Sequence, residues 1–144
     1  MSPYPGSLRF LDAVVAAGLQ VAVVTSSLNG EMVLTAAGLR DRFEIVVDGV
    51  RARAEKLAGK PAPDTYAFAA ELLGLTAAQC VVVEDAESGI QSGRAGDFGL
   101  VLGVDRGVGS HVLFEAGADT VVTDLDELLP LIGSTVLTPS GVRA

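Results

Sequence analysis

The stretch VVVEDAESGIQSGRAG, residues 81–96, changes from a strand pattern to a helix pattern within a few residues. Its three valines favour a β-strand that is buried on both faces, as is typical of parallel sheets. Small and polar residues follow, and they predict a helix over 87–95. Two adjacent carboxylates, Glu84 and Asp85, lie at the junction. Charged side chains are rarely buried without a partner, so we expect this turn to carry a functional site.

The rest of the chain repeats this alternation of strand and helix patterns. Strands are expected at 19–24, 43–49, 81–84, 99–104 and 120–123. Helices are expected around 8–15 and over 28–37, 64–74, 87–95 and 110–117, with a last one starting at Asp124 and a non-helical connection at 51–59. This order predicts an α/β protein, a Rossmann-like three-layer αβα fold with a mostly parallel sheet. Residues 1–133 are expected to form one domain, and residues 134–144 a flexible tail.

Composition excludes several classes of protein. The 144 residues carry a net charge of −8 and no cluster of lysine or arginine, so we expect neither nucleic-acid binding nor binding to an anionic membrane. The single cysteine, Cys80, excludes an internal disulfide and a cysteine-rich metal site, and we expect it to be a buried structural thiol. Neither a signal-peptide pattern nor a long apolar run is present, which favours the cytoplasm.

Polar residues follow two of the other predicted strands. Thr25, Ser26, Ser27 and Asn29 come directly after the strand at 19–24. Hydroxyl groups and free backbone N–H groups at the start of a helix suit a phosphate. The alternative is that Ser27 only caps the helix.

Lys60 lies between Gly59 and Pro61 in the loop AGKPAPD, residues 58–64. Two prolines stiffen this loop, so the lysine could place its ammonium group accurately beside an anion. The alternative is a solvated lysine before a helix that Asp64 caps. At the third strand end, Glu84 and Asp85 offer the hard oxygen ligands that Mg²⁺ prefers. Here the alternative is that Asp85 caps the next helix.

These segments together resemble three motifs of the haloacid dehalogenase-like superfamily, in the family's order. The resemblance is greatest to the subgroup of β-phosphoglucomutase and phosphoglycolate-type phosphatases. It implies that Thr25, with Ser26, Ser27, Asn29 and Lys60, binds phosphate, and that Thr25 and Lys60 are also catalytic residues. It further implies that Asp85 binds Mg²⁺ with Glu84 as its helper. It covers about residues 4–133 and is specific in KPAPD and EDAESGIQ.

One motif of the superfamily is missing from these 144 residues. In the family, an N-terminal strand ends in Asp-x-Asp, which supplies the nucleophile and the general acid/base, and a mobile cap closes over the substrate. Both would precede residue 1, so the resemblance implies the core part of a larger enzyme. The sequence Asp124-Leu125-Asp126 looks similar to this motif, but Glu127 completes a capping box with Asp124. We expect these residues to start a helix.

The resemblance implies a Mg²⁺-dependent phosphatase or phosphomutase that acts on a small phosphorylated metabolite such as a sugar phosphate. Without the nucleophile, we expect this chain to have little or no activity. The alternative is a non-catalytic protein that binds a phosphorylated ligand or a partner chain. A receiver-type signalling domain is disfavoured, because the first predicted strand ends in Thr-Ser-Ser rather than in acidic residues. His111 is expected to be structural or exposed.

The resemblance implies that the strand of the missing motif would lie between the strands that end at Thr25 and Glu84. We expect the chain to close this gap by direct pairing of the two strands, by self-association, or by binding a segment that supplies the strand, because exposed strand edges tend to pair.

Overall fold

The computed structural model describes residues 5–36, 38, 40–132, 137–138 and 141–142. Its parallel strands are β1 (Ala22–Val24), β2 (Ile45–Val47), β3 (Val81–Glu84), β4 (Leu100–Val104) and β5 (Thr120–Val122). Its α-helices are α1 (Pro5–Ala16), α2 (Gly30–Ala36), α3 (Gly49–Ala54), α4 (Asp64–Leu73), α5 (Glu87–Ala95) and α6 (Ser110–Ala116). Three 3₁₀ helices, η1 (Arg40–Arg42), η2 (Ala77–Gln79) and η3 (Leu125–Leu131), complete the core. The predicted α/β fold is confirmed.

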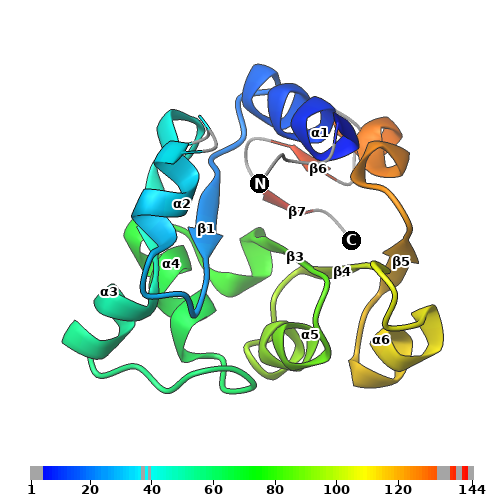
Figure 1. Ribbon diagram of the computed structural model, residues 1–144. Coiled ribbons are helices and arrows are strands. Elements are labelled where there is room, and N and C mark those ends of the chain that lie inside the picture. Colours follow the sequence, from blue (N-terminus) through cyan, green and yellow to red (C-terminus); the bar gives the residue numbers. More distant parts are fainter. Residues whose placement is uncertain (1–4, 37, 39, 133–136, 139–140, 143–144) are drawn as a thin grey trace.

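The strands form a middle layer with helices on both sides (Figure 1). On one side, α1 and η3 cover the sheet around Phe10, Val14, Leu102 and Leu128. On the other side, α4, α5 and α6 enclose a second core, whose fully buried members are Ile90, Val101 and Leu113. Successive side chains of a strand point to opposite faces. Neighbouring residues of β4, Val101 and Leu102, therefore belong to different cores.

The middle layer consists of two separate parallel sheets. One holds β1 and β2, and the other holds β3, β4 and β5 in that order. Of the three expected ways to close the gap, direct pairing of the strands that end at Thr25 and Glu84 is wrong, because β1 and β3 share no ladder. Self-association and binding of a further segment stay predictions.

The backbone shows which groups face the gap between β1 and β3. The Val21 carbonyl accepts from Glu44 N at 3.2 Å, and Thr25 N donates to the Val47 carbonyl at 2.9 Å, so these β1 groups face β2. Alternate residues of a strand direct their backbone groups to opposite neighbours. Ala22 and Val24 therefore face the gap. By the same alternation Val81 and Val83 face it from β3, because the Cys80 carbonyl accepts from Gly99 N of the β4 side at 3.1 Å.

Some predicted elements need correction. The connection expected at 51–59 is helical in its first part, because α3 runs over Gly49–Ala54. Asp48 caps this helix by accepting a hydrogen bond from Arg51 N at 2.9 Å. This helix has no apolar periodicity because it is short and largely exposed. Asp64 does not cap α4: the N-cap is Pro63, and the Asp64 carboxylate accepts from Ala58 N instead. Gly74 ends α4 in the left-handed conformation, as predicted.

The expected flexible tail, 134–144, lies mostly outside the described residues. Its described parts are two short strands, β6 (Leu137–Thr138) and β7 (Gly141–Val142), which pair antiparallel. The proposed boundary at residue 133 stays a prediction.

Candidate functional site

The carboxyl ends of β1 and β3 lie at the same edge of the molecule, and the segment from α3 to α4 runs along that edge (Figure 1). This arrangement brings Lys60 from the connecting loop to Glu84 at the end of β3. Lys60 Nζ lies 2.6 Å from Glu84 Oε1, and the two side chains are only 17% and 10% exposed. The two predicted site residues therefore form a largely buried ion pair.

Glu84 is held by donors on both of its carboxylate oxygens. Oε1 accepts from Lys60 Nζ and also from the Tyr66 hydroxyl at 3.0 Å, while Oε2 accepts from Ala86 N at 3.3 Å. The first turn of α5 also packs against this carboxylate, since a Cβ on Gly89 would lie 2.0 Å from Glu84 Cδ. Glu84 is thus fixed in one orientation.

Contacts to α4 and α5 position the loop that carries Lys60. Ala62 N donates to the Gly59 carbonyl at 3.1 Å, which closes a turn around Lys60. The fully buried Ser92 of α5 donates its hydroxyl to the Ala62 carbonyl at 2.5 Å. The Lys60 ammonium also lies 5.0 Å from the centre of the Tyr66 ring, a distance that allows a cation–π contact. Lys60 is therefore not the solvated lysine of the alternative interpretation.

Asp85 is exposed and, within the described part of the chain, its side chain makes no hydrogen bond or ion pair. The interpretation that Asp85 caps the next helix is wrong: the N-cap of α5 is Ala86, and no side chain caps it. Asp85 is consequently the carboxylate of the pair that remains free to bind an external cation.

The two carboxylates fit a Mg²⁺ ion in part. Among the described residues no three His, Cys, Asp or Glu side chains gather into a metal-binding group. Mg²⁺ is, however, commonly bound by one or two carboxylates and completes its shell with water and phosphate oxygens. Asp85 and the second oxygen of Glu84 supply two such carboxylate ligands.

The predicted phosphate loop lies across the gap, after β1. Thr25 is half-buried, whereas Ser26, Ser27 and Asn29 are exposed. The Thr25 hydroxyl accepts from Ser27 N at 3.2 Å, and the Ser27 hydroxyl accepts from Asn29 N at 3.1 Å. Ser27 therefore supports the turn before α2, which begins at Gly30. No hydrogen bond or ion pair in the described structure joins this loop to Lys60 or Glu84.

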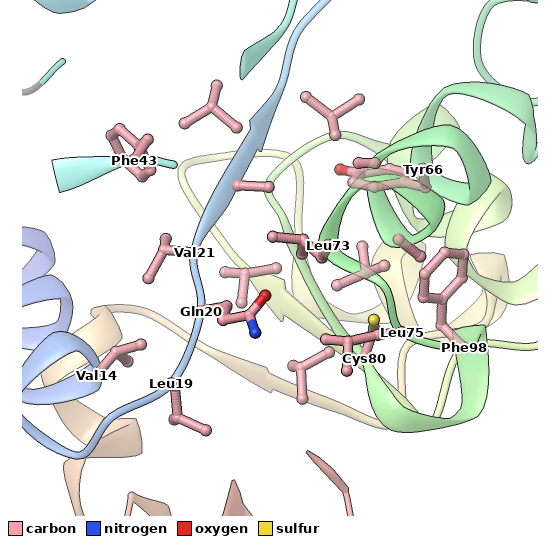
Figure 2. A pocket seen from close by; sticks show the side chains of 18 of the residues that line it. Val14, Leu19, Gln20, Val21, Phe43, Tyr66, Leu73, Leu75, Cys80 and Phe98 are labelled. Atoms are coloured by element: carbon pink, nitrogen blue, oxygen red, sulfur yellow. The ribbon is translucent and has the colours of Figure 1, made fainter. Parts of the chain in front are cut away.

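An apolar cavity of about 400 Å³ lies between the two parts of the site. Residues of β1 and β3 form two of its sides, α1 and α4 contribute the others, and Tyr66 and Glu84 lie on its wall. Figure 2 shows Tyr66 and Phe98 on the side opposite Val21 and Phe43. The cavity occupies the gap left between the unpaired edges of the two sheets.

The Asp-x-Asp sequence at 124–126 has a structural role, as expected. Asp124 and Glu127 form the capping box of η3. Asp126 makes a 2.7 Å ion pair with Arg9 of α1. His111 is exposed on α6.

Cys80 lines the cavity and is half-buried rather than fully buried. Partial burial raises the pKa of its thiol.

A model of the haloacid dehalogenase-like hydrolase family matches residues 1–97. The chain belongs to this family. Its curated relatives include the β-phosphoglucomutase of Mycobacterium bovis, which is 54% identical over 130 residues that cover 88% of this chain and 49% of the relative. The β-phosphoglucomutase of Bacillus subtilis is 31% identical and covers 86% of this chain and 50% of the relative.

The solved structures agree with this assignment to the haloacid dehalogenase-like family. A family hydrolase from Deinococcus radiodurans, solved with bound phosphate and sodium, has a TM-score of 0.78 and 31% identity, and covers 90% of this chain and 61% of that one. Relatives and structures together support the β-phosphoglucomutase and phosphoglycolate phosphatase-like subgroup. The chain spans about half the length of the curated β-phosphoglucomutases that it matches.

Sequence reasoning missed two polar residues of this family member. Asp48 is buried at the end of β2, and a Cβ on Gly30 would lie 2.9 Å from its Cβ and 3.0 Å from Thr25 Cγ2, so it lies close to the phosphate loop. An Asp-Gly pair after an apolar strand was the available signal. Tyr66 had no comparable signal, because only the tertiary structure brings its hydroxyl, on α4, to Glu84 at the end of β3. None of the described helices is long and apolar enough to span a membrane.

Tyr66 makes the stability of the fold sensitive to alkaline pH. Burial first, and then the charge of Glu84 and its hydrogen bond to the phenol, raise the pKa of Tyr66 above its usual value of 10.0, and Asp85 adds to this effect. The unfolded chain loses the phenolic proton first, so this stabilising contribution is complete below about pH 10 and is lost as the pH rises further.

We therefore expect the free energy of unfolding to fall more steeply above pH 10 in the wild type than in Tyr66→Phe. Urea titrations at pH 9 and pH 11 measure this difference. In a Tyr4→Phe background, absorbance at 295 nm follows the Tyr66 phenol directly. A phenol that titrates with its usual pKa would contradict the prediction.

Proposed function

We propose that this protein is the core of a Mg²⁺-dependent phosphatase or phosphomutase that acts on a small phosphorylated metabolite, most simply a sugar phosphate. The observation that carries the proposal is the Lys60–Glu84 pair, fixed at a strand end beside the free carboxylate of Asp85. The names of the β-phosphoglucomutase relatives support the choice of substrate class.

Each residue of the site has a defined task in this proposal. The Thr25 hydroxyl, with the exposed polar groups of Ser26, Ser27 and Asn29, would donate hydrogen bonds to phosphate oxygens. Lys60 would place its ammonium beside the same oxygens, where negative charge develops during phosphoryl transfer.

Asp85 and the second oxygen of Glu84 would hold Mg²⁺, which when bound neutralises charge on the transferring phosphoryl group. The donors on Glu84 hold the first oxygen in place. The apolar wall of the cavity would keep water away from this end of the site.

The Asp-x-Asp sequence at 124–126 does not supply the nucleophile in this proposal, because Asp124 caps η3 and Asp126 pairs with Arg9. We propose that a strand inserted between β1 and β3 delivers it. Both edges of the gap belong to parallel strands and expose backbone groups toward a cavity of about 400 Å³. A strand parallel to both would pair on each side and would end near Thr25 and Glu84.

A peptide complementation experiment tests this function. The probe is a synthetic strand of five valine, isoleucine and leucine residues that ends in Asp-x-Asp, and the matched control ends in Asn-x-Asn. Phosphate release from glucose 1-phosphate is measured with Mg²⁺ present. Labelling of Cys80, the single cysteine of the chain, reports whether the cavity is filled.

We expect both peptides to slow Cys80 labelling, and only the Asp-x-Asp peptide to produce phosphate release. This release should disappear in Asp85→Ala. Protection of Cys80 without release would favour the non-catalytic, partner-binding alternative. Release by the chain alone that is insensitive to Asp85→Ala would contradict the proposed function.

A further inference from the structure

Tyr66 touches both members of the buried ion pair. Its hydroxyl donates to Glu84 Oε1 at 3.0 Å, and its ring lies 5.0 Å from Lys60 Nζ. The ring also meets Phe98 edge-on, with 6.0 Å between ring centres. Tyr66 belongs to the first turns of α4, so it joins this helix to the ends of β3 and of the lysine loop.

We infer that Tyr66 is a positioning residue that decides which oxygen of Glu84 is left for the bound cation, an inference that rests on the proposed function. An ionised carboxylate oxygen accepts about two hydrogen bonds. Lys60 and Tyr66 use both of these places on Oε1. Oε2 has only the longer contact to Ala86 N, at 3.3 Å, and therefore keeps a free lone pair on the side of the β3–α5 turn.

Packing alone does not account for the hydroxyl of Tyr66. The residue lies on the wall of an apolar cavity, where a phenylalanine would make the same ring contact with Phe98 (Figure 2). A hydroxyl in such a place costs free energy unless it has a partner. Glu84 is the partner that the described structure provides, so the hydroxyl acts on the site.

Without this hydroxyl, Lys60 would be the remaining donor on Oε1, and Oε2 would keep only the long contact from Ala86 N at 3.3 Å. The carboxylate could then turn more easily, so that either oxygen faces the ammonium. Cation binding would then have to order the carboxylate, which lowers affinity. The ring would still face Lys60, so phosphate binding should change little. The Tyr66 hydroxyl thus contacts Glu84, whereas the ring contacts Lys60. Substitutions can therefore separate the effect on cation binding from the effect on phosphate binding.

The experiment compares Tyr66→Phe, Tyr66→Leu and Phe98→Leu in the full chain. Mn²⁺, which takes the same carboxylate ligands as Mg²⁺, is the cation probe and is followed by its paramagnetic resonance. Inorganic phosphate is the anion probe. Hydrogen exchange of the Ala86 amide reports the orientation of Glu84 in the metal-free protein.

We expect Tyr66→Phe to raise the Kd for Mn²⁺ about fivefold, as for the loss of one ordinary hydrogen bond, and to speed exchange at Ala86. Its phosphate affinity should stay within about twofold of the wild type, whereas Tyr66→Leu should weaken phosphate binding as well, because the ring contact with Lys60 is lost. Phe98→Leu should reduce stability but leave both affinities unchanged, since the hydroxyl contact remains.

Unchanged Mn²⁺ affinity and unchanged Ala86 exchange in Tyr66→Phe would overturn the inference while leaving the proposed function in place. Equal losses of affinity in Tyr66→Phe and Phe98→Leu would also overturn it, because they would show a purely structural role. If the wild type does not bind Mn²⁺, the proposed metal site fails, and Ala86 exchange alone then decides whether Tyr66 positions Glu84.

Discussion

Replacing Lys60 by methionine is expected to lower the free energy of unfolding by about 3 kcal/mol, because it leaves a buried carboxylate without its counter-ion. Glu84 is only 10% exposed and lies 2.6 Å from the lysine nitrogen. Methionine keeps the length and apolar character of the lysine stem, so the change removes mainly the charge. Urea unfolding at pH 7 measures the loss.

Two further variants show that the loss comes from the unpaired charge. Glu84→Gln in the Lys60→Met background removes the orphaned charge and should recover most of the stability. Lys56→Met, at an exposed lysine of the preceding turn, should stay within about 0.5 kcal/mol of the wild type. The interpretation fails if Lys60→Met is as stable as Lys56→Met.

Gly89→Ala is expected to destabilise the protein by about 2 kcal/mol, although alanine is normally preferred to glycine inside a helix by about 1 kcal/mol. The new Cβ would lie 2.0 Å from Glu84 Cδ and 2.1 Å from Oε2. A flexible side chain could move aside, but Glu84 is held by Lys60, Tyr66 and the Ala86 amide. The carboxylate must leave these donors to make room.

Thermal or urea unfolding of Gly89→Ala measures this cost, and a double variant provides the control. Glu84→Ala removes the atoms that the new Cβ meets, so Glu84→Ala with Gly89→Ala should be no less stable than Glu84→Ala alone. If Gly89→Ala by itself stabilises the protein, as helix propensity alone predicts, Glu84 is not fixed in the observed orientation.

The turn from β3 into α5 was predicted with its boundaries intact, at Val81–Glu84 and Glu87–Ala95. This success has a local cause: three valines favour a strand, and the small residues after the acidic pair permit close packing of the helix start. The capping box of Asp124 and Glu127 and the glycine that ends α4 are local in the same sense. Structure that depends on interactions within a few residues of the chain can be predicted from the sequence.

Two of the wrong predictions, a non-helical connection where α3 lies and a capping role for Asp85, also share a cause. Helix α3 has no apolar stripe, so its presence depends on the cap supplied by Asp48 at the end of β2. Asp85 has the residue type of a cap but stays free, because the chain enters α5 one residue later, at Ala86. In both cases the same local pattern permits more than one backbone path, and the packing of the neighbouring elements decides between them.

The sequence by itself determined the α/β alternation, the family and the residue types at the three strand ends, because these depend on the order of residues along the chain. Only the tertiary structure decided that Lys60 pairs with Glu84 and leaves Asp85 free, that Tyr66 joins the pair, and that β1 and β3 remain apart around a cavity. The physical reason is distance: Lys60 and Glu84 are 24 residues apart in the chain, and no local pattern encodes which of two adjacent carboxylates a distant ammonium will meet.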